Sequence, residues 1–132
     1  MRKRELKEDN IMLDCLFVGC GGFIGAVLRF LMGKLPVKNP AGFPVTTFII
    51  NIIGAFAIGC IAALALKNSN LNPRLVLFLK AGICGGFTTF STFSLETGEL
   101  LRSGSFVTAI AYVVLSVVCG VLAVLAAQYL CQ

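Results

Sequence analysis

The chain has 132 residues, of which 58% are hydrophobic and only 13% are charged, with a formal net charge of +5 and no histidine. Because a soluble domain carries about 25% charged residues, this composition excludes an ordinary water-soluble fold and indicates one unit embedded in lipid. The absence of histidine excludes hydrolase triads and histidine metal centres, and no nucleophile has a plausible base, so we expect no enzymatic activity.

Four stretches of the chain are apolar enough to cross a membrane, which takes about 20 residues per helix. They cover residues 13–33, 46–66, 75–101 and 106–130, and the third is interrupted. Too few residues remain for another domain, so residues 1–132 are expected to form one four-helix transmembrane domain. The short connections predict that consecutive helices run antiparallel. An even number of spans places both ends on one side of the membrane.

A charged segment, residues 1–10, precedes the first apolar stretch. Basic residues before an apolar run imitate a secretory signal, but this run continues past Cys20 to Met32 without a small-x-small cleavage site. We therefore expect a solvated tail near anionic headgroups. Seven Lys and Arg residues lie on the N-terminal side of the membrane, against three or four on the other side, which favours a cytoplasmic N-terminus. Without the tail the two counts balance, which would permit insertion in both orientations.

The cysteines are scattered through the apolar stretches. None forms a C-x-x-C pair or a metal-binding spacing, so we expect small buried apolar side chains, with no disulfide framework and no structural zinc. The six positions are Cys15, Cys20, Cys60, Cys84, Cys119 and Cys131.

Each apolar stretch carries a stripe of small or polar residues, the kind through which helices associate in lipid. In the first, Gly21 and Gly25 form a G-x-x-x-G pair, and in the fourth, residues 108, 112, 116 and 120 repeat at four-residue spacing. Helix packing explains these stripes. It explains Asn51 and Arg29 poorly, because an amide or a guanidinium in hydrocarbon is costly and is usually functional.

The third stretch contains adjacent glycines, Gly85 and Gly86, followed by FTTFSTFSLE. This pattern predicts a helix break at these glycines, which is tolerated at membrane depth only where it is buried in protein or lines a wet cavity. Carbonyls freed at such a break are ready ligands for a hard cation. Beyond the break the helix is polar on nearly every side, and four helices are too few to surround it. We therefore expect two copies to associate, with the third helix at the centre.

The polar residues that would face the interior of such an assembly offer N–H and O–H donors without a fixed charge. The positive ring edges of phenylalanines can accompany a small anion. Arg29 and the positive net charge favour a negative solute, whereas Glu96 and Glu99 oppose it. The residues alone therefore indicate a pathway for a small polar or anionic solute without identifying it. Plain packing is the alternative explanation for the phenylalanines, which are Phe87, Phe90 and Phe93.

Three motifs resemble the CrcB/Fluc family of fluoride channels, in the same order along nearly the whole chain. They are GGFIGAVLRF at residues 21–30, TFIINIIG at 47–54 and GICGGFTTFSTFSLE at 82–96. The resemblance implies an all-α membrane protein that assembles as an antiparallel, dual-topology dimer with two fluoride pores at the interface. Such a channel lies in the cell membrane and gives passive export of fluoride trapped in the cytoplasm. Its partners would be fluoride, lipid and a second copy of the chain, with no nucleic acid.

The same resemblance implies roles for individual residues. Asn51 would be the pore amide near the vestibule, with Thr47 one turn away, and Arg29 would be structural or vestibular. The remaining pathway residues would be the ring-edge pair Phe90 and Phe93, the polar track of Thr92, Ser94, Tyr112 and Ser116, and Glu96 near one end.

A structural sodium ion at the dimer centre is also implied, held by the main-chain carbonyls of Gly85 and Thr88 and by their counterparts in the second subunit. The sequence departs from the family at Gly120, where some relatives carry a hydroxyl, so the far end of the polar track is open. The basic extension also leaves open a fixed orientation with a paired homologous subunit.

Two other functions are alternatives for a membrane protein of this size. A small dual-topology multidrug exporter also has four helices, but it needs an acidic residue inside the membrane, typically in the first helix, and here Asp14 lies only at the edge of that helix. An accessory subunit without transport would need stripes for packing alone, which leaves Asn51 and the broken third helix unexplained.

Overall fold

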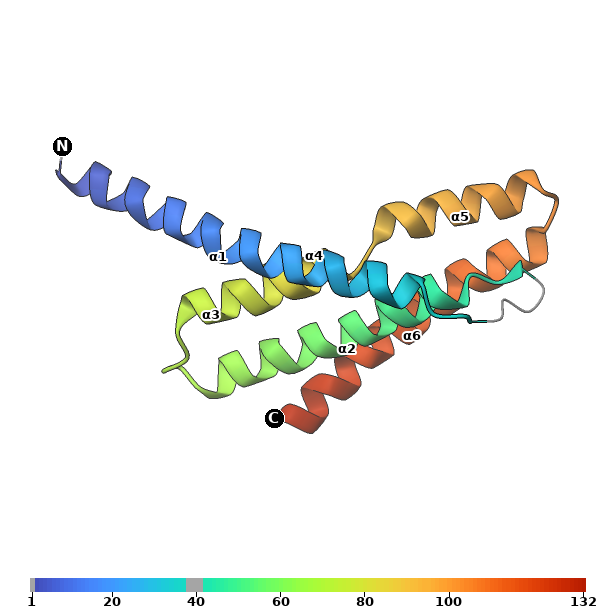
Figure 1. Cartoon of the computed structure of the whole chain (residues 1–132). Coiled ribbons are helices and arrows are strands. Elements are labelled where there is room, and N and C mark those ends of the chain that lie inside the picture. The colour runs from blue at the N-terminus through green and yellow to red at the C-terminus, as the bar shows by residue number, and fades with distance from the viewer. Residues whose placement is uncertain (1, 38–41) are drawn as a thin grey trace.

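The computed structural model describes residues 2–37 and 42–132, with side chains from residue 10 on. Within these residues every regular element is a helix. In chain order they are α1 (Arg2–Gly33), α2 (Val45–Lys67), α3 (Pro73–Leu77), the π-helical segment η2 (Phe78–Cys84), α4 (Gly85–Phe87), α5 (Phe90–Arg102) and α6 (Phe106–Cys131). The segments α3, η2, α4 and α5 form one long third helix that is interrupted between α4 and α5 (Figure 1).

Four helical stretches have the length and apolarity to cross a membrane. They are Asn10–Gly33, Val45–Lys67, Pro73–Arg102 and Phe106–Cys131. Each contains one of the four windows predicted from the sequence. The prediction of an all-helical membrane protein with four spans and a broken third helix is therefore confirmed.

The charged residues 2–9 continue the first spanning helix, because α1 begins at Arg2. Figure 1 shows this part of α1 extending past the other helices. The N-terminal part of α1 and the C-terminal end of α6 lie at the same end of the bundle, as four spans require. Met1 lies outside the described residues, and the position of this segment near anionic headgroups stays a prediction.

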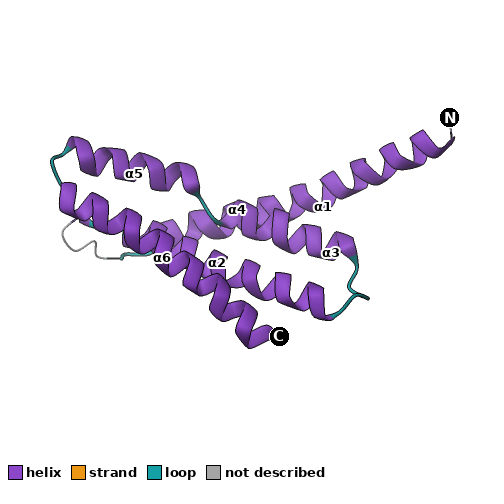
Figure 2. Cartoon of the chain, turned by 180° about the vertical axis from the view of Figure 1, so that it is seen from behind, coloured by secondary structure: helices purple, strands orange, loops and turns teal. Residues whose placement is uncertain are grey.

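The helices pack in two pairs. α1 lies along η2 and α4. α2 lies along α6, and the chain runs in the same direction through these two helices. α5 lies beside α6 and away from α1, as both views of the chain show (Figures 1 and 2). The buried apolar residues are mostly small, and Tyr112 is the only large side chain that is fully buried within the described residues.

Glycines on both sides of the contact between α1 and the third helix allow the two backbones to touch. A Cβ added at Gly21 would collide with the main-chain oxygen of Phe78, and one added at Gly25 would collide with that of Ile83. From the opposite side, a Cβ at Gly82 would lie 2.8 Å from the Cα of Gly21. The G-x-x-x-G pair therefore packs against glycines of the third helix, as small residues do between membrane helices.

The helix break lies at Thr88 and Thr89, so its predicted position at Gly85 and Gly86 is wrong. Gly85 is helical, with φ −63° and ψ −39°, whereas Thr88 and Thr89 are extended, with ψ 159° and 115°. The physical reason is that Gly86 is used for close approach, since a Cβ there would collide with the main-chain oxygen of Gly22. The threonines instead carry hydroxyls that form hydrogen bonds with main-chain groups on either side of the break.

The glycine contact predicts opposite outcomes for two neighbouring substitutions on α1. Gly25→Ala should lower the melting temperature of the purified protein, because overpacking at a close contact costs about 1–3 kcal/mol. Gly22→Ala should melt at the original temperature or above it, since its added Cβ would meet open space. Thermal unfolding in detergent measures both, and equal melting of the two variants would contradict this account of the contact.

Candidate functional site

The break in the third helix is held by the side chain of Asn51 from α2. The Oδ1 atom of Asn51 accepts a hydrogen bond from the Thr89 N–H at 2.8 Å, and its Nδ2 donates to the Thr89 carbonyl at 3.1 Å. One amide thus pairs with both main-chain polar groups of a residue that has left the helix. A carboxamide carries two N–H donors, so Asn51 uses one of them here and has a second.

Two carbonyls at the break lose the hydrogen bonds that a continuous helix would give them. The Thr89 N–H would bond to the carbonyl of Gly85, but it bonds to Asn51. The Thr92 N–H would bond to the carbonyl of Thr88, but it donates to the Thr89 hydroxyl at 3.1 Å. Gly85 and Thr88 are the residues whose carbonyls the sequence resemblance assigned to a cation.

The side chain of Thr88 fits against α2 because residue 54 is a glycine. A Cβ added at Gly54 would collide with the Thr88 side-chain methyl. The Thr88 hydroxyl donates to the carbonyl of Cys84 at 2.9 Å, which also accepts the Thr88 N–H at 3.0 Å, so it reinforces the last turn before the break. Asn51 therefore holds Thr89, and Gly54, three residues further along α2, leaves room for Thr88.

A groove of about 340 Å³ lies beside the break, between α2, the third helix and α6. Its walls are mostly apolar, and its polar side chains come from three different helices. The lining residues that bear on its chemistry are the polar Asn51, Thr88 and Ser116 and the aromatic Phe90 and Phe93.

Ser116 is the groove residue whose hydroxyl lacks a hydrogen bond. Its hydroxyl oxygen is buried and has no hydrogen-bond partner in the part of the chain that the structure describes. A buried hydroxyl without a partner costs about 1–3 kcal/mol. The position of Ser116 on the wall of the groove therefore fits a ligand that accepts a hydrogen bond.

The two phenylalanines at the start of α5 lie against each other, with ring centroids 5.8 Å apart. Phe93 also contacts the ring of Tyr112, at 5.0 Å, and is half-buried. Phe90 is 80% exposed, so this chain covers very little of it. The two rings therefore extend from the interior of the subunit to its surface.

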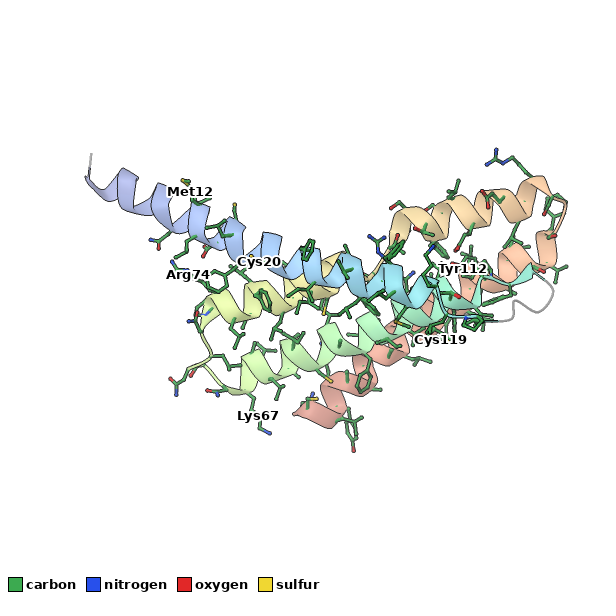
Figure 3. All side chains as sticks on the ribbon, in the orientation of Figure 1. Met12, Cys20, Lys67, Arg74, Tyr112 and Cys119 are labelled. Carbon is green, nitrogen blue, oxygen red and sulfur yellow. The ribbon has the colours of Figure 1, made fainter. Side chains whose placement is uncertain are left out.

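A second polar cluster joins three helices next to the groove. The carboxylate of Glu96 accepts hydrogen bonds from the hydroxyls of Thr47 and Tyr112, each at 2.7 Å. These bonds connect α5 to α2 and α6, and Tyr112 is completely buried where the three helices meet (Figure 3). Hydrogen bonds from hydroxyls to a carboxylate are short and strong, so this cluster fixes α5 firmly.

The structure does not bring every predicted site residue into the groove. The hydroxyl of Ser94 is exposed and donates to the carbonyl of Phe90 in its own helix, at 2.9 Å. Thr92 accepts a bond from the hydroxyl of Thr89, at 3.0 Å. Arg29 is half-buried on α1, which contributes no residue to the groove wall.

Sequence reasoning missed Thr89 and the way in which Glu96 joins two hydroxyls. A local signal existed for Thr89, because a threonine before a helical run is a favourable N-cap, and its hydroxyl does cap α5. No local pattern predicts that Glu96 meets Thr47, since the two residues are far apart in the chain.

The acidic residue that a multidrug exporter would need is engaged elsewhere. The guanidinium of Arg74 on α3 donates from Nε to Asp14 at 3.0 Å and from Nη2 to Asn10 at 2.7 Å. These bonds connect α1 to α3 near the end of the first span, away from the groove.

Comparison with known proteins places these features in a family. The family model described as CrcB-like protein, Camphor Resistance (CrcB), matches residues 16–128. The chain is 44% identical over 116 residues to the fluoride-specific ion channel FluC of Azobacteroides pseudotrichonymphae, covering 86% of this chain and 93% of that protein. It is 48% identical over 107 residues to FluC of Ruminiclostridium cellulolyticum, covering 80% and 82% of the two chains. FluC of Clostridium perfringens is 42% identical over 122 residues, covering 92% and 95%. This chain belongs to the CrcB family.

Proposed function

We propose that this protein is a fluoride-selective channel that lets fluoride leave the cell passively across the cell membrane. The names of the relatives support fluoride as the ion, and the groove supports the mechanism. The observation that carries the proposal is the buried, unpartnered hydroxyl of Ser116 on the wall of that groove. Fluoride accepts hydrogen bonds strongly, so it is the kind of ligand that this donor fits.

The groove replaces the water around the ion with neutral donors. A conducting site must bind its ion well enough to admit it and weakly enough to release it. The Ser116 hydroxyl and the second N–H of Asn51 are dipoles without a full charge, and the positive edge of Phe93 adds a weak attraction. A nearby lysine or arginine would hold fluoride more tightly, and the groove wall contains neither.

Glu96 has a supporting role in this mechanism. Its negative charge would repel an anion, but both carboxylate oxygens are occupied by the hydroxyls of Thr47 and Tyr112. The cluster fixes the beginning of α6, on which Ser116 lies one turn beyond Tyr112. The role proposed for Arg29 is structural or vestibular, because it lies on a helix outside the groove.

The pathway becomes complete in an antiparallel dimer, with the third helices at its centre. α5 has an exposed face that carries Phe90, Ser91 and Ser94, and α1 does not cover it (Figure 1). Hydroxyls are poorly suited to face lipid, whereas they are common between membrane helices. A second copy, or a paired homologous subunit, would close the groove, supply its own phenylalanine and generate two pores of the same kind.

A sodium ion at the centre of that dimer fits the main chain of the break. The carbonyls of Gly85 and Thr88 have lost their helical donors, and carbonyl oxygens are the ligands that alkali cations take in discontinuous membrane helices. Two carbonyls from each copy would hold the ion. Its positive charge would compensate the negative ends of the carbonyl dipoles, which otherwise lack partners. Its proposed role is therefore structural.

The function is tested by efflux from liposomes that contain the purified protein. A fluoride electrode should record rapid loss of trapped fluoride, while chloride in matched liposomes stays inside. Liposomes without protein are the control. Equal leakage of the two ions, or leakage of neither, would contradict a fluoride-selective channel.

Removing the unpartnered hydroxyl separates conduction from stability. Ser116→Ala should slow fluoride efflux about tenfold, because one hydrogen bond to the ion is worth about 1–2 kcal/mol. The melting temperature should stay unchanged or rise, since the Ser116 hydroxyl has no hydrogen-bond partner among the described residues. Ser103→Ala removes a hydroxyl that is exposed and distant from the groove, and it should conduct normally. Normal conduction by Ser116→Ala would remove this residue from the pathway.

Asn51→Ala should behave differently, because this side chain holds the break as well as lining the groove. Both main-chain groups of Thr89 lose their partner, so efflux and melting temperature should fall together. Efflux and thermal unfolding measured on the same preparation check this pairing. A variant that conducts slowly but melts normally would show that the Thr89 bonds do not stabilise the fold.

A further inference from the structure

Two thiols from different helices meet in the half of the bundle that contains the C-terminal end of α6. Cys60 lies on α2 and Cys131 is the last residue of α6. Their side chains are within hydrogen-bonding reach of each other. Both cysteines are half-buried and reduced in the structure. The sequence gives no sign of this pair, because the two residues are far apart in the chain.

Close packing of the two helices produces the contact. A Cβ added at Gly59 would lie 2.8 Å from both the Cβ of Ala127 and the carbonyl oxygen of Val124. Cys60 follows Gly59 directly, and Cys131 lies one turn beyond Ala127. A disulfide needs two Cα atoms about 4.4–6.8 Å apart, which helices separated by the usual 8–10 Å rarely offer without such a glycine.

The same end of the helix pair is accessible to small polar molecules. A groove of about 440 Å³ lies between α2 and α6, with Lys67, Gln128 and Gln132 on its walls. The Lys67 ammonium group donates to the carbonyl of Gln132 at 3.1 Å, so charged and polar groups mark this end as the aqueous side of the two spans. Cys131 directly precedes Gln132, so a water-soluble oxidant can reach its thiol from this end.

We propose that Cys60 and Cys131 form a disulfide under oxidising conditions, which fastens the C-terminal end of α6 to α2. The oxidant would be a low-molecular-weight disulfide such as glutathione disulfide. One cysteine thiolate attacks it and releases one glutathione thiolate, which gives a mixed disulfide. The second cysteine then attacks the protein sulfur and releases the other glutathione thiolate. The protein loses two protons and two electrons, and the oxidant gains them as two thiols. A reducing compartment keeps the pair as thiols.

The test uses the complete chain, purified in detergent and treated with either dithiothreitol or glutathione disulfide. After unfolding and alkylation with N-ethylmaleimide, the reduced protein should carry an adduct on each of its six cysteines. The oxidised protein should carry two fewer adducts and have lost two hydrogen atoms. Fragmentation in the mass spectrometer should place the link between Cys60 and Cys131. The oxidised protein should also melt at a higher temperature.

Matched variants separate this pair from the other cysteines. Cys131→Ser should abolish both the link and the rise in melting temperature, whereas Cys119→Ser, on the same helix, should keep both. The proposal is overturned if Cys60 and Cys131 stay fully alkylated after oxidation. It is also overturned if each carries glutathione separately, or if the link joins a different pair. Because these readouts use no fluoride measurement, they stand independently of the proposed channel function.

Discussion

A polypeptide that leaves its helix inside a membrane must satisfy its main-chain polar groups without water, and here one amide side chain does so. Each unpaired group in hydrocarbon costs several kcal/mol, so a break at Thr89 is possible only because Asn51 faces it. The amide is suited to the task because it offers a donor and an acceptor with the same spacing as a peptide group. A carboxylate would supply only acceptors, and a hydroxyl is too short to reach both atoms.

Glycines and threonines have different structural roles in the third helix. The glycines bring main chain against main chain, at the contact of Gly21 with Gly82 and again at Gly86. The threonines end one helical segment and begin the next, since Thr88 bonds backward to Cys84 and Thr89 bonds forward to Thr92. Between them, the carbonyls of Gly85 and Thr88 are left without helical donors. The polar character of this region therefore comes from the main chain as much as from the side chains.

The sequence predicts the fold well because each span follows from a simple requirement, a run of apolar residues of sufficient length. It also predicts that Asn51 is special, because an amide within hydrocarbon needs a partner. It does not predict which partner, and the adjacent glycines favour a break at Gly85 and Gly86 instead of at the threonines. The sequence does not predict the cluster of Glu96 with Thr47 and Tyr112 either, for a related reason. Such contacts depend on how helices are rotated against each other, which an apolar window does not specify.

The positions of the first and last helix ends determine how the orientation of the protein in the membrane can be measured. The N-terminal part of α1 and the C-terminal end of α6 lie at the same end, so reporter domains fused to either would sample the same compartment. Two different reporters on one molecule would therefore always agree with each other. A population inserted in both directions would be recognised by partial signals of equal size from both reporters, and a population inserted in one direction by complete signals or by none.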